Sequence, residues 1–299
     1  MTPSCQPKSC PTAHQGTVMQ PGHKKSQNAR YIPNATTAEN RGEAGLRVTA
    51  HRIGARAWAL LIRSELKMVV RDTAGLIVPL GMPILILVMN AAGAGGEEVG
   101  AGLTALEAFV LPLVLTIVIA MLGLINMPSF LATYRKTGVL RRLAVTPASP
   151  LMVLIAQVVV SLAQVLLGTA AALGIAVLAF GAQPPRDLGV AIGVLALSVA
   201  AMYALGMVVA SVAPTPNSSV AIGLVLFFAL GALGGLFGGT GGLGDTAAQI
   251  GQVLPFGASV QALAAAWAGQ AVATASLVSL AVTAVLGTTA SALLFRWDR

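Results

Sequence analysis

The sequence predicts an all-α integral membrane protein. Of its 299 residues, 56% are hydrophobic and only 9% are charged, and the mean hydropathy is +0.82. A soluble domain carries about 25% charged residues, so this composition cannot supply a water-facing surface. The apolar residues also form runs of the roughly 20 residues that a transmembrane helix needs. These runs do not alternate between polar and apolar positions, which argues against the strands of a membrane barrel.

Six apolar stretches have the length of a span, and we expect six transmembrane helices. They cover residues 73–92, 105–127, 151–180, 188–213, 219–237 and 271–295. Of the 18 lysines and arginines, eleven precede the first stretch, four lie between the second and third, and two follow the sixth. Six crossings place these three regions on one side, and cations mark the cytoplasmic side. We therefore expect a multi-pass protein of the inner (plasma) membrane with both termini cytoplasmic.

The chain divides into two predicted parts. Residues 1–45 are polar and rich in Pro, Ser and Asn, which is typical of a disordered extension, here cytoplasmic. Residues 46–299 form the six-span domain. Just before the first span, residues 56–72 predict an amphipathic helix in the inner membrane interface, with cations near anionic lipid head groups. The alternative is a soluble helix packed on a partner. In residues 56–72 the apolar positions are Trp58, Leu61, Ile62, Leu66 and Val69, and the cations are Arg56, Arg63, Lys67 and Arg71.

Glycines crowd the end of the fifth span, in residues 231–244. A Walker-type phosphate loop requires a lysine after its glycines, and the chain has none after Lys136. We expect these glycines to permit close helix contacts and then a turn. Residues 250–267 are apolar but interrupted by Pro255 and Gly257, so we expect one or two short helices in a re-entrant segment on the outer side.

The charge distribution also excludes several functions. Residues 188–244 and 246–295 contain no charged residue, so a proton relay near the membrane midplane is disfavoured. All three histidines precede the first span, and Cys5 and Cys10 lack an established ligand spacing. We therefore predict no catalytic, cofactor-binding or metal-binding residue, and no nucleic-acid partner. Sodium sites built from carbonyls and hydroxyls remain possible, but if the protein moves a cargo uphill, we expect its energy to come from another chain. A secondary transporter and a membrane scaffold or sensor remain alternatives.

A short basic segment, residues 134–150, interrupts the apolar chain. It carries four cations and no acid, and it ends in Thr146, Pro147 and Pro150. We expect Tyr134–Leu143 to form a short helix, which the following residues break before the third span. One interpretation is a docking element for a soluble partner. The other is a signal that only sets topology.

The motif in this segment bears on that choice. A charged pair is followed by Gly-Val-Leu, two basic residues, Leu and Thr-Pro-Ala-Ser. The segment, with six spans and an amphipathic helix, resembles the membrane subunit of type-2 ABC exporters over residues 52–299. That group includes daunorubicin-type drug exporters and polysaccharide exporters. The chain departs from the family in lacking a Glu near Arg135 or Lys136. The resemblance implies an ATPase-coupling segment comprising Tyr134, Arg135, Lys136, Gly138, Leu140, Arg141, Arg142, Leu143, Thr146 and Pro147.

The same resemblance implies the partners. Two membrane subunits, as a homodimer or a pair of different permeases, join two ABC ATPase subunits, and the lipids surround them. ATP and Mg²⁺ then bind the ATPase and not this chain. Uncharged walls suit a hydrophobic or amphiphilic cargo such as a drug, an antibiotic or a lipid-like molecule.

Two helical faces carry small or polar residues. One is on the third span and one on the sixth, and each could line an export path or a dimer seam. The alternative is packing within one subunit through interhelical hydrogen bonds. The polar residues of the two faces are Gln157, Ser161 and Gln164, and Ser276, Ser279 and Thr283.

Overall fold

A computed structural model of the protein describes residues 55–94, 96–100, 102–137, 150–238 and 244–294. The predicted disordered extension, residues 1–45, lies outside them. The elements are α1 (Ala55–Arg71), α2 (Thr73–Ala94), β1 (Glu98–Gly100), β2 (Leu103–Thr104), the π-helix η2 (Leu106–Val110), α3 (Leu111–Ala120), the π-helix η3 (Met121–Asn126), α4 (Met127–Lys136), α6 (Pro150–Phe180), α7 (Leu188–Val212), α8 (Pro216–Leu233), α9 (Asp245–Val253), α10 (Pro255–Ala268) and α11 (Thr274–Leu294).

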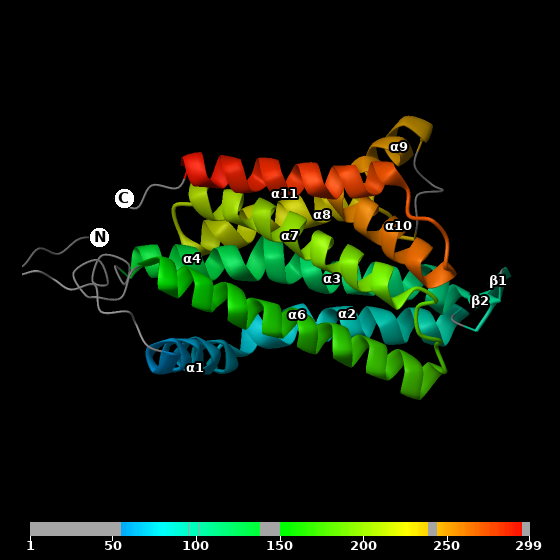
Figure 1. The fold of residues 1–299 in the computed structure, drawn as a ribbon, viewed down its shortest axis with the longest axis horizontal. Helices are drawn as coiled ribbons and strands as arrows, with labels where there is room; N and C mark the ends of the chain where they lie inside the picture. The colour runs from blue at the N-terminus through cyan, green and yellow to red at the C-terminus, as the bar shows by residue number, and fades with distance from the viewer. Residues whose placement is uncertain (1–54, 95, 101, 138–149, 239–243, 295–299) are drawn as a thin grey trace, which may run out of the picture. The chain divides into compact units, whose positions relative to one another are not determined.

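Six helices of the described part are long and apolar enough to cross a membrane, which confirms the predicted all-α integral membrane fold. Figure 1 shows them side by side, with α1 at one end of the bundle and the short β1–β2 hairpin at the other. The end with α1, Arg135 and Lys136 is called the basic end below, and the other is called the hairpin end. The antiparallel pairing of β1 with β2 was not predicted from the sequence.

The second span is the centre of the fold. It runs as one helical segment from Leu106 to Lys136 through η2, α3, η3 and α4. In its most apolar window 72% of the residues are buried, against 17–44% in the other five spans. In Figure 1, α2 and α6 lie on one side of it and α7, α8 and α11 on the other. The other spans leave apolar faces exposed, as expected for helices in contact with lipid.

The second span is longer than predicted, because the helix continues through Pro128 to Lys136, as it does through Pro112. A proline lacks the N–H for the α-helical bond and clashes with the preceding turn. Pro112 follows η2 and Pro128 follows η3, so each lies just after a π-helix. The wider turn of a π-helix lets the chain pass a proline without ending. The prediction of a span ending near residue 127, with a separate helix from Tyr134, is therefore wrong: Tyr134 continues the same helix.

Glycines hold η3 tightly against α7 and α8. A side-chain carbon added to Gly206 of α7 would overlap the carbonyl oxygen of Gly123, and one added to Gly223 of α8 would overlap that of Leu124. Gly123 itself lies against Tyr203 and Met202 of α7. Backbone therefore touches backbone where these three helices meet, as small residues permit in membrane helices.

The glycine-rich exit of the fifth span also makes close contacts, as predicted. Gly234, which ends α8, lies against Phe256 and the backbone of Gly257 in α10, and Gly251 of α9 lies against the backbone of Leu233. Residues 250–267 form parts of two short helices, α9 and α10, separated at an extended Leu254 before a proline. The prediction of short helices here is confirmed, while their depth in the membrane stays a prediction.

Gly206→Ala should destabilise the protein by about 1–3 kcal/mol, because the new methyl group has no room beside the Gly123 carbonyl. Gly193→Ala is the matched control on the same helix. Nothing lies within 4 Å of a methyl group there, so this change should be neutral or stabilising by up to about 1 kcal/mol. The measurement is thermal unfolding of the purified protein in one detergent. Equal melting temperatures for the two variants would contradict the close contact.

Candidate functional site

The last turn of α4 is tied to α1 at the basic end. The Tyr134 hydroxyl donates a hydrogen bond to the Glu65 carboxylate, and the Met68 sulfur lies 3.8 Å from the same hydroxyl. Tyr134 also packs with Val153 of α6 and with Leu61 of α1. The first residue of the predicted coupling segment thus joins the amphipathic helix to the third span.

Glu65 lies on the apolar face of α1. Its side chain is 7% exposed, and the neighbouring Val69 packs against Phe130 of α4 and Val160 of α6. Burial raises the pKa of Glu65, and the hydrogen bond from Tyr134 opposes that rise. Leu66, predicted on the same face, is 47% exposed instead. The reason is the helical spacing: Glu65, and not Leu66, shares a face with Ile62 and Val69.

Arg135 points to a different neighbour. Its guanidinium donates a hydrogen bond to the carbonyl oxygen of Ala213, the residue that ends α7. The chain then turns into α8, where Thr215 and Ser218 cap each other's backbone at the helix start. Lys136 is exposed and ends α4. The last turn of α4 therefore contacts both α1 and the α7–α8 link.

Only part of the predicted coupling segment can be placed. Tyr134, Arg135 and Lys136 lie at the end of α4. The remaining predicted residues lie outside the described residues, and their role stays a prediction. They are Gly138, Leu140, Arg141, Arg142, Leu143, Thr146 and Pro147.

The polar face of the third span is buried inside this chain. Gln157 is 0% exposed, Ser161 1% and Gln164 4%. Ser161 shares a 2.5 Å hydrogen bond with the hydroxyl of Tyr203 on α7, and Asn126 of η3 donates to Gln164 at 3.5 Å. We call these five residues the polar seam. Their burial favours packing within one subunit, and an export path along this face would require α6 to separate from η3 and α7.

The polar face of the sixth span also turns inward. Ser276 is buried, Ser279 and Thr283 are half-buried, and Ser279 donates a hydrogen bond to the carbonyl oxygen of Val253 at the end of α9. One turn beyond Thr283, Gly287 lies against Ala204 of α7. The face thus packs on α7 and α9, and its part in a path or seam stays a prediction.

At the hairpin end, a buried carboxylate joins two links. Glu107 accepts hydrogen bonds from the backbone N–H groups of Gln183 at 2.6 Å and Thr104 at 2.9 Å. Its side chain is almost fully buried. The Trp267 indole of α10 donates to the Gln183 carbonyl at 3.3 Å. These bonds fasten the α6–α7 link to the start of the second span and to α10.

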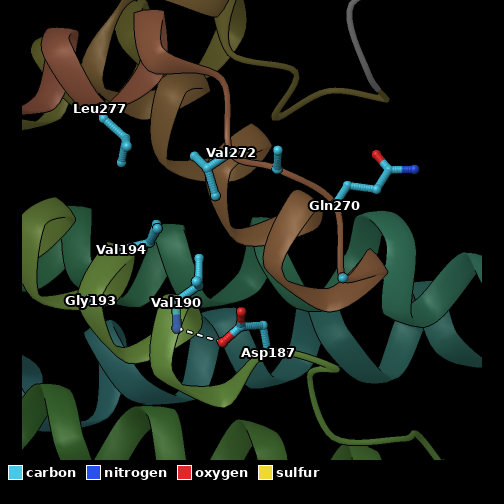
Figure 2. A pocket seen from close by; sticks show the side chains of 9 residues that line it. Asp187, Val190, Gly193, Val194, Gln270, Val272 and Leu277 are labelled. Carbon is cyan, nitrogen blue, oxygen red and sulfur yellow. Dashed lines mark hydrogen bonds between the residues drawn. The ribbon is translucent and has the colours of Figure 1, made fainter.

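Beside this link, the start of α7 and the α10–α11 link line an open pocket of about 450 Å³ (Figure 2). Val190, Val194, Val272 and Leu277 supply apolar walls. Asp187 lies at the pocket, but its carboxylate caps α7 by accepting from the Val190 N–H at 3.0 Å. The pocket therefore offers an apolar surface with one carboxylate already bonded.

Three residues of this structure were missed from the sequence: Glu65, Asn126 and Tyr203. The signal for Glu65 was available, because an acid at helical spacing between Ile62 and Val69 interrupts an apolar face. Asn126 and Tyr203 had no comparable signal, because their partners lie on other helices.

A bundle of six candidate membrane helices with an amphipathic helix bound to the basic end of its central span is the architecture of a multi-pass integral membrane protein. The comparisons extend this conclusion. The family model of the ABC-2 type transporter matches residues 56–268, which include α1 and every described element up to α10. The chain therefore belongs to the ABC-2 type transporter family, as the predicted permease subunit. The comparison with curated proteins finds no match.

The contact between α1 and α4 can be tested with three variants. Tyr134→Phe should cost about 1–3 kcal/mol, because it leaves the buried Glu65 carboxylate without this donor. Glu65→Gln should be milder, since the amide oxygen still accepts from the tyrosine. Glu65→Leu combined with Tyr134→Phe should recover much of the loss, because both polar partners are removed together.

The measurement is the free energy of unfolding, with a fluorescent label on α1 to report its release. Lys67→Gln, on the exposed side of α1, serves as the control. Strict additivity of the Glu65 and Tyr134 effects would contradict a direct bond between them.

Proposed function

We propose that the chain is the membrane subunit of an ATP-driven exporter. Two permease subunits, identical or paired, assemble with two copies of a separate ABC ATPase that binds ATP and Mg²⁺. The complex lies in the inner (plasma) membrane with both termini of the chain in the cytoplasm, and the basic end faces the ATPase. The family match over residues 56–268 supports the permease assignment that this proposal extends.

The observation that carries the proposal is the pair of contacts at the end of α4. Tyr134 bonds to α1 and Arg135 bonds to the end of α7. A movement of residues 134–147 on ATP binding therefore has direct routes to the amphipathic helix and to the α7–α8 link. The continuous central helix extends the same movement toward the hairpin end.

The cargo we propose is hydrophobic or amphiphilic: a drug, an antibiotic or a lipid-like molecule. Support comes from the composition of the spans and from the pocket at the hairpin end, whose walls are mainly aliphatic. The polar faces of α6 and α11 are the candidate walls of a path once the helices separate. Their neutral amides and hydroxyls could bind an uncharged or weakly polar group.

Coupling is tested at residues 141 and 142. Arg141→Lys with Arg142→Lys keeps the positive charge that directs topology but loses the planar guanidinium fork. We expect normal insertion, with transport and cargo-stimulated ATP hydrolysis reduced about tenfold, which corresponds to the loss of about one charge-assisted hydrogen bond. Arg186→Lys, at the hairpin end, is the matched control. The measurement is ATPase activity of the copurified complex in lipid, together with export from vesicles.

Parent-like transport by the double lysine variant would show that the basic segment only sets topology. A chain that transports cargo without any ATPase partner would identify a secondary transporter instead. If the chain transports nothing, either with or without an ATPase partner, it would be identified as a scaffold.

Topology is tested by cysteine labelling in a Cys5→Ser, Cys10→Ser background. A cysteine at Gly96 or Asp245, near the hairpin end, should react with an impermeant thiol reagent added to intact cells. A cysteine at Thr137 should react only after the membrane is opened. The reverse pattern would place the basic end outside and remove it from any cytoplasmic ATPase.

A further inference from the structure

The polar seam contains more hydrogen-bonding capacity than the protein itself satisfies. Within the described residues, the Nε2 and Oε1 atoms of Gln157 and the Nε2 atom of Gln164 are buried without a protein hydrogen-bond partner. A glutamine amide offers two N–H donors and an oxygen with two lone pairs. Leaving such groups unbonded in an apolar interior costs free energy, so buried amides nearly always have partners.

Lipid cannot supply these partners. The seam belongs to membrane-spanning helices, and hydrocarbon chains neither donate nor accept hydrogen bonds. The amides also face the interior of the bundle, with Gln157 at 0% and Gln164 at 4% exposure. The two lie seven residues apart on one helical face, which separates them by about 10 Å along α6. The partner must therefore be a small molecule inside the protein.

The packing around the seam is uneven. On the α7 and α8 side, η3 touches its neighbours through backbone at Gly206 and Gly223. On the α6 side its polar contact is the 3.5 Å bond from Asn126 to Gln164, at the outer limit of a hydrogen bond. Because α7 and α8 hold η3, the looser packing lies toward α6, next to the unbonded amides.

We propose that the polar seam is an internal water-binding site between α6, η3 and α7. Water both donates and accepts, and it therefore suits Nε2 donors and an Oε1 acceptor within one site. A bound cation suits the seam less well, because two of the three unbonded atoms are N–H donors that repel it. The Ser161 and Tyr203 hydroxyls, which share a hydrogen bond, supply further donors and acceptors at the centre of the site.

The test is hydroxyl-radical labelling of the full chain in lipid nanodiscs, in which X-rays generate radicals from bound water beside a side chain. We expect oxidation of Tyr203, although its side chain is only 7% exposed. Phe227, which is 1% exposed in an apolar cluster, is the internal control and should stay unmodified. Tyr203 labelled no more than Phe227 would overturn the proposal.

Two sets of variants locate the water. Gln157→Leu with Gln164→Leu should abolish labelling of Tyr203, while Gln270→Leu on the exposed α10–α11 link should leave it unchanged. Undiminished labelling of Tyr203 in the double leucine variant would overturn the proposed water-binding site. Loss of labelling when Na⁺ and K⁺ are replaced by a bulky organic cation would show a metal-ion site instead.

A single substitution gives a second measurement if the double variant does not fold. Gln157→Met keeps the side-chain length and removes the amide. In a hydrated seam it should lower the melting temperature, because bound water loses a partner. In a dry seam it should raise the melting temperature, because an unbonded polar group is removed. A rise would overturn the proposal without bearing on the exporter assignment.

Discussion

The structure depends on keeping the second span helical past its two prolines. In hydrocarbon every backbone N–H and C=O group must be bonded within the chain, so a broken helix at the centre of the bundle would leave several groups unsatisfied. A π-helix precedes each of Pro112 and Pro128, and the helical segment continues through both prolines. Because the span then continues to Lys136, α2, α6, α7 and α8 all pack against one central element, while α11 packs on α7 and α10.

Contacts around this central span differ in kind from one side to the other. Toward α7 and α8 the contact is made by backbone at glycines, which fixes the helices at short range. Toward α6 it is made partly by the amides of Asn126 and Gln164, and α6 is joined to α7 by the hydroxyls of Ser161 and Tyr203; such bonds can exchange partners. The three helices η3, α7 and α8 therefore form the stiffer part of the bundle, and α6 is the element whose position depends on exchangeable contacts.

The sequence predicted the spans well because hydropathy over about 20 residues is a strong signal, and α6 and α7 differ from their predicted limits by about one residue. The second span was predicted to end at residue 127, but the helix continues through Pro128, as α2 continues through Pro79 and Pro83. Periodicity placed Gln157, Ser161 and Gln164 on one face. It could not show that Asn126 and Tyr203 face them, since helix neighbours depend on packing between distant segments.

Tyr134 and Arg135 are consecutive, yet they bond to helices on different sides of α4. Neighbouring residues of an α-helix point about 100° apart, so these bonds act at two places around the helix axis. A force applied beyond Lys136 would then act on α4 as a torque as well as a push along it. Rotation of that one turn would displace α1 and the α7–α8 link together.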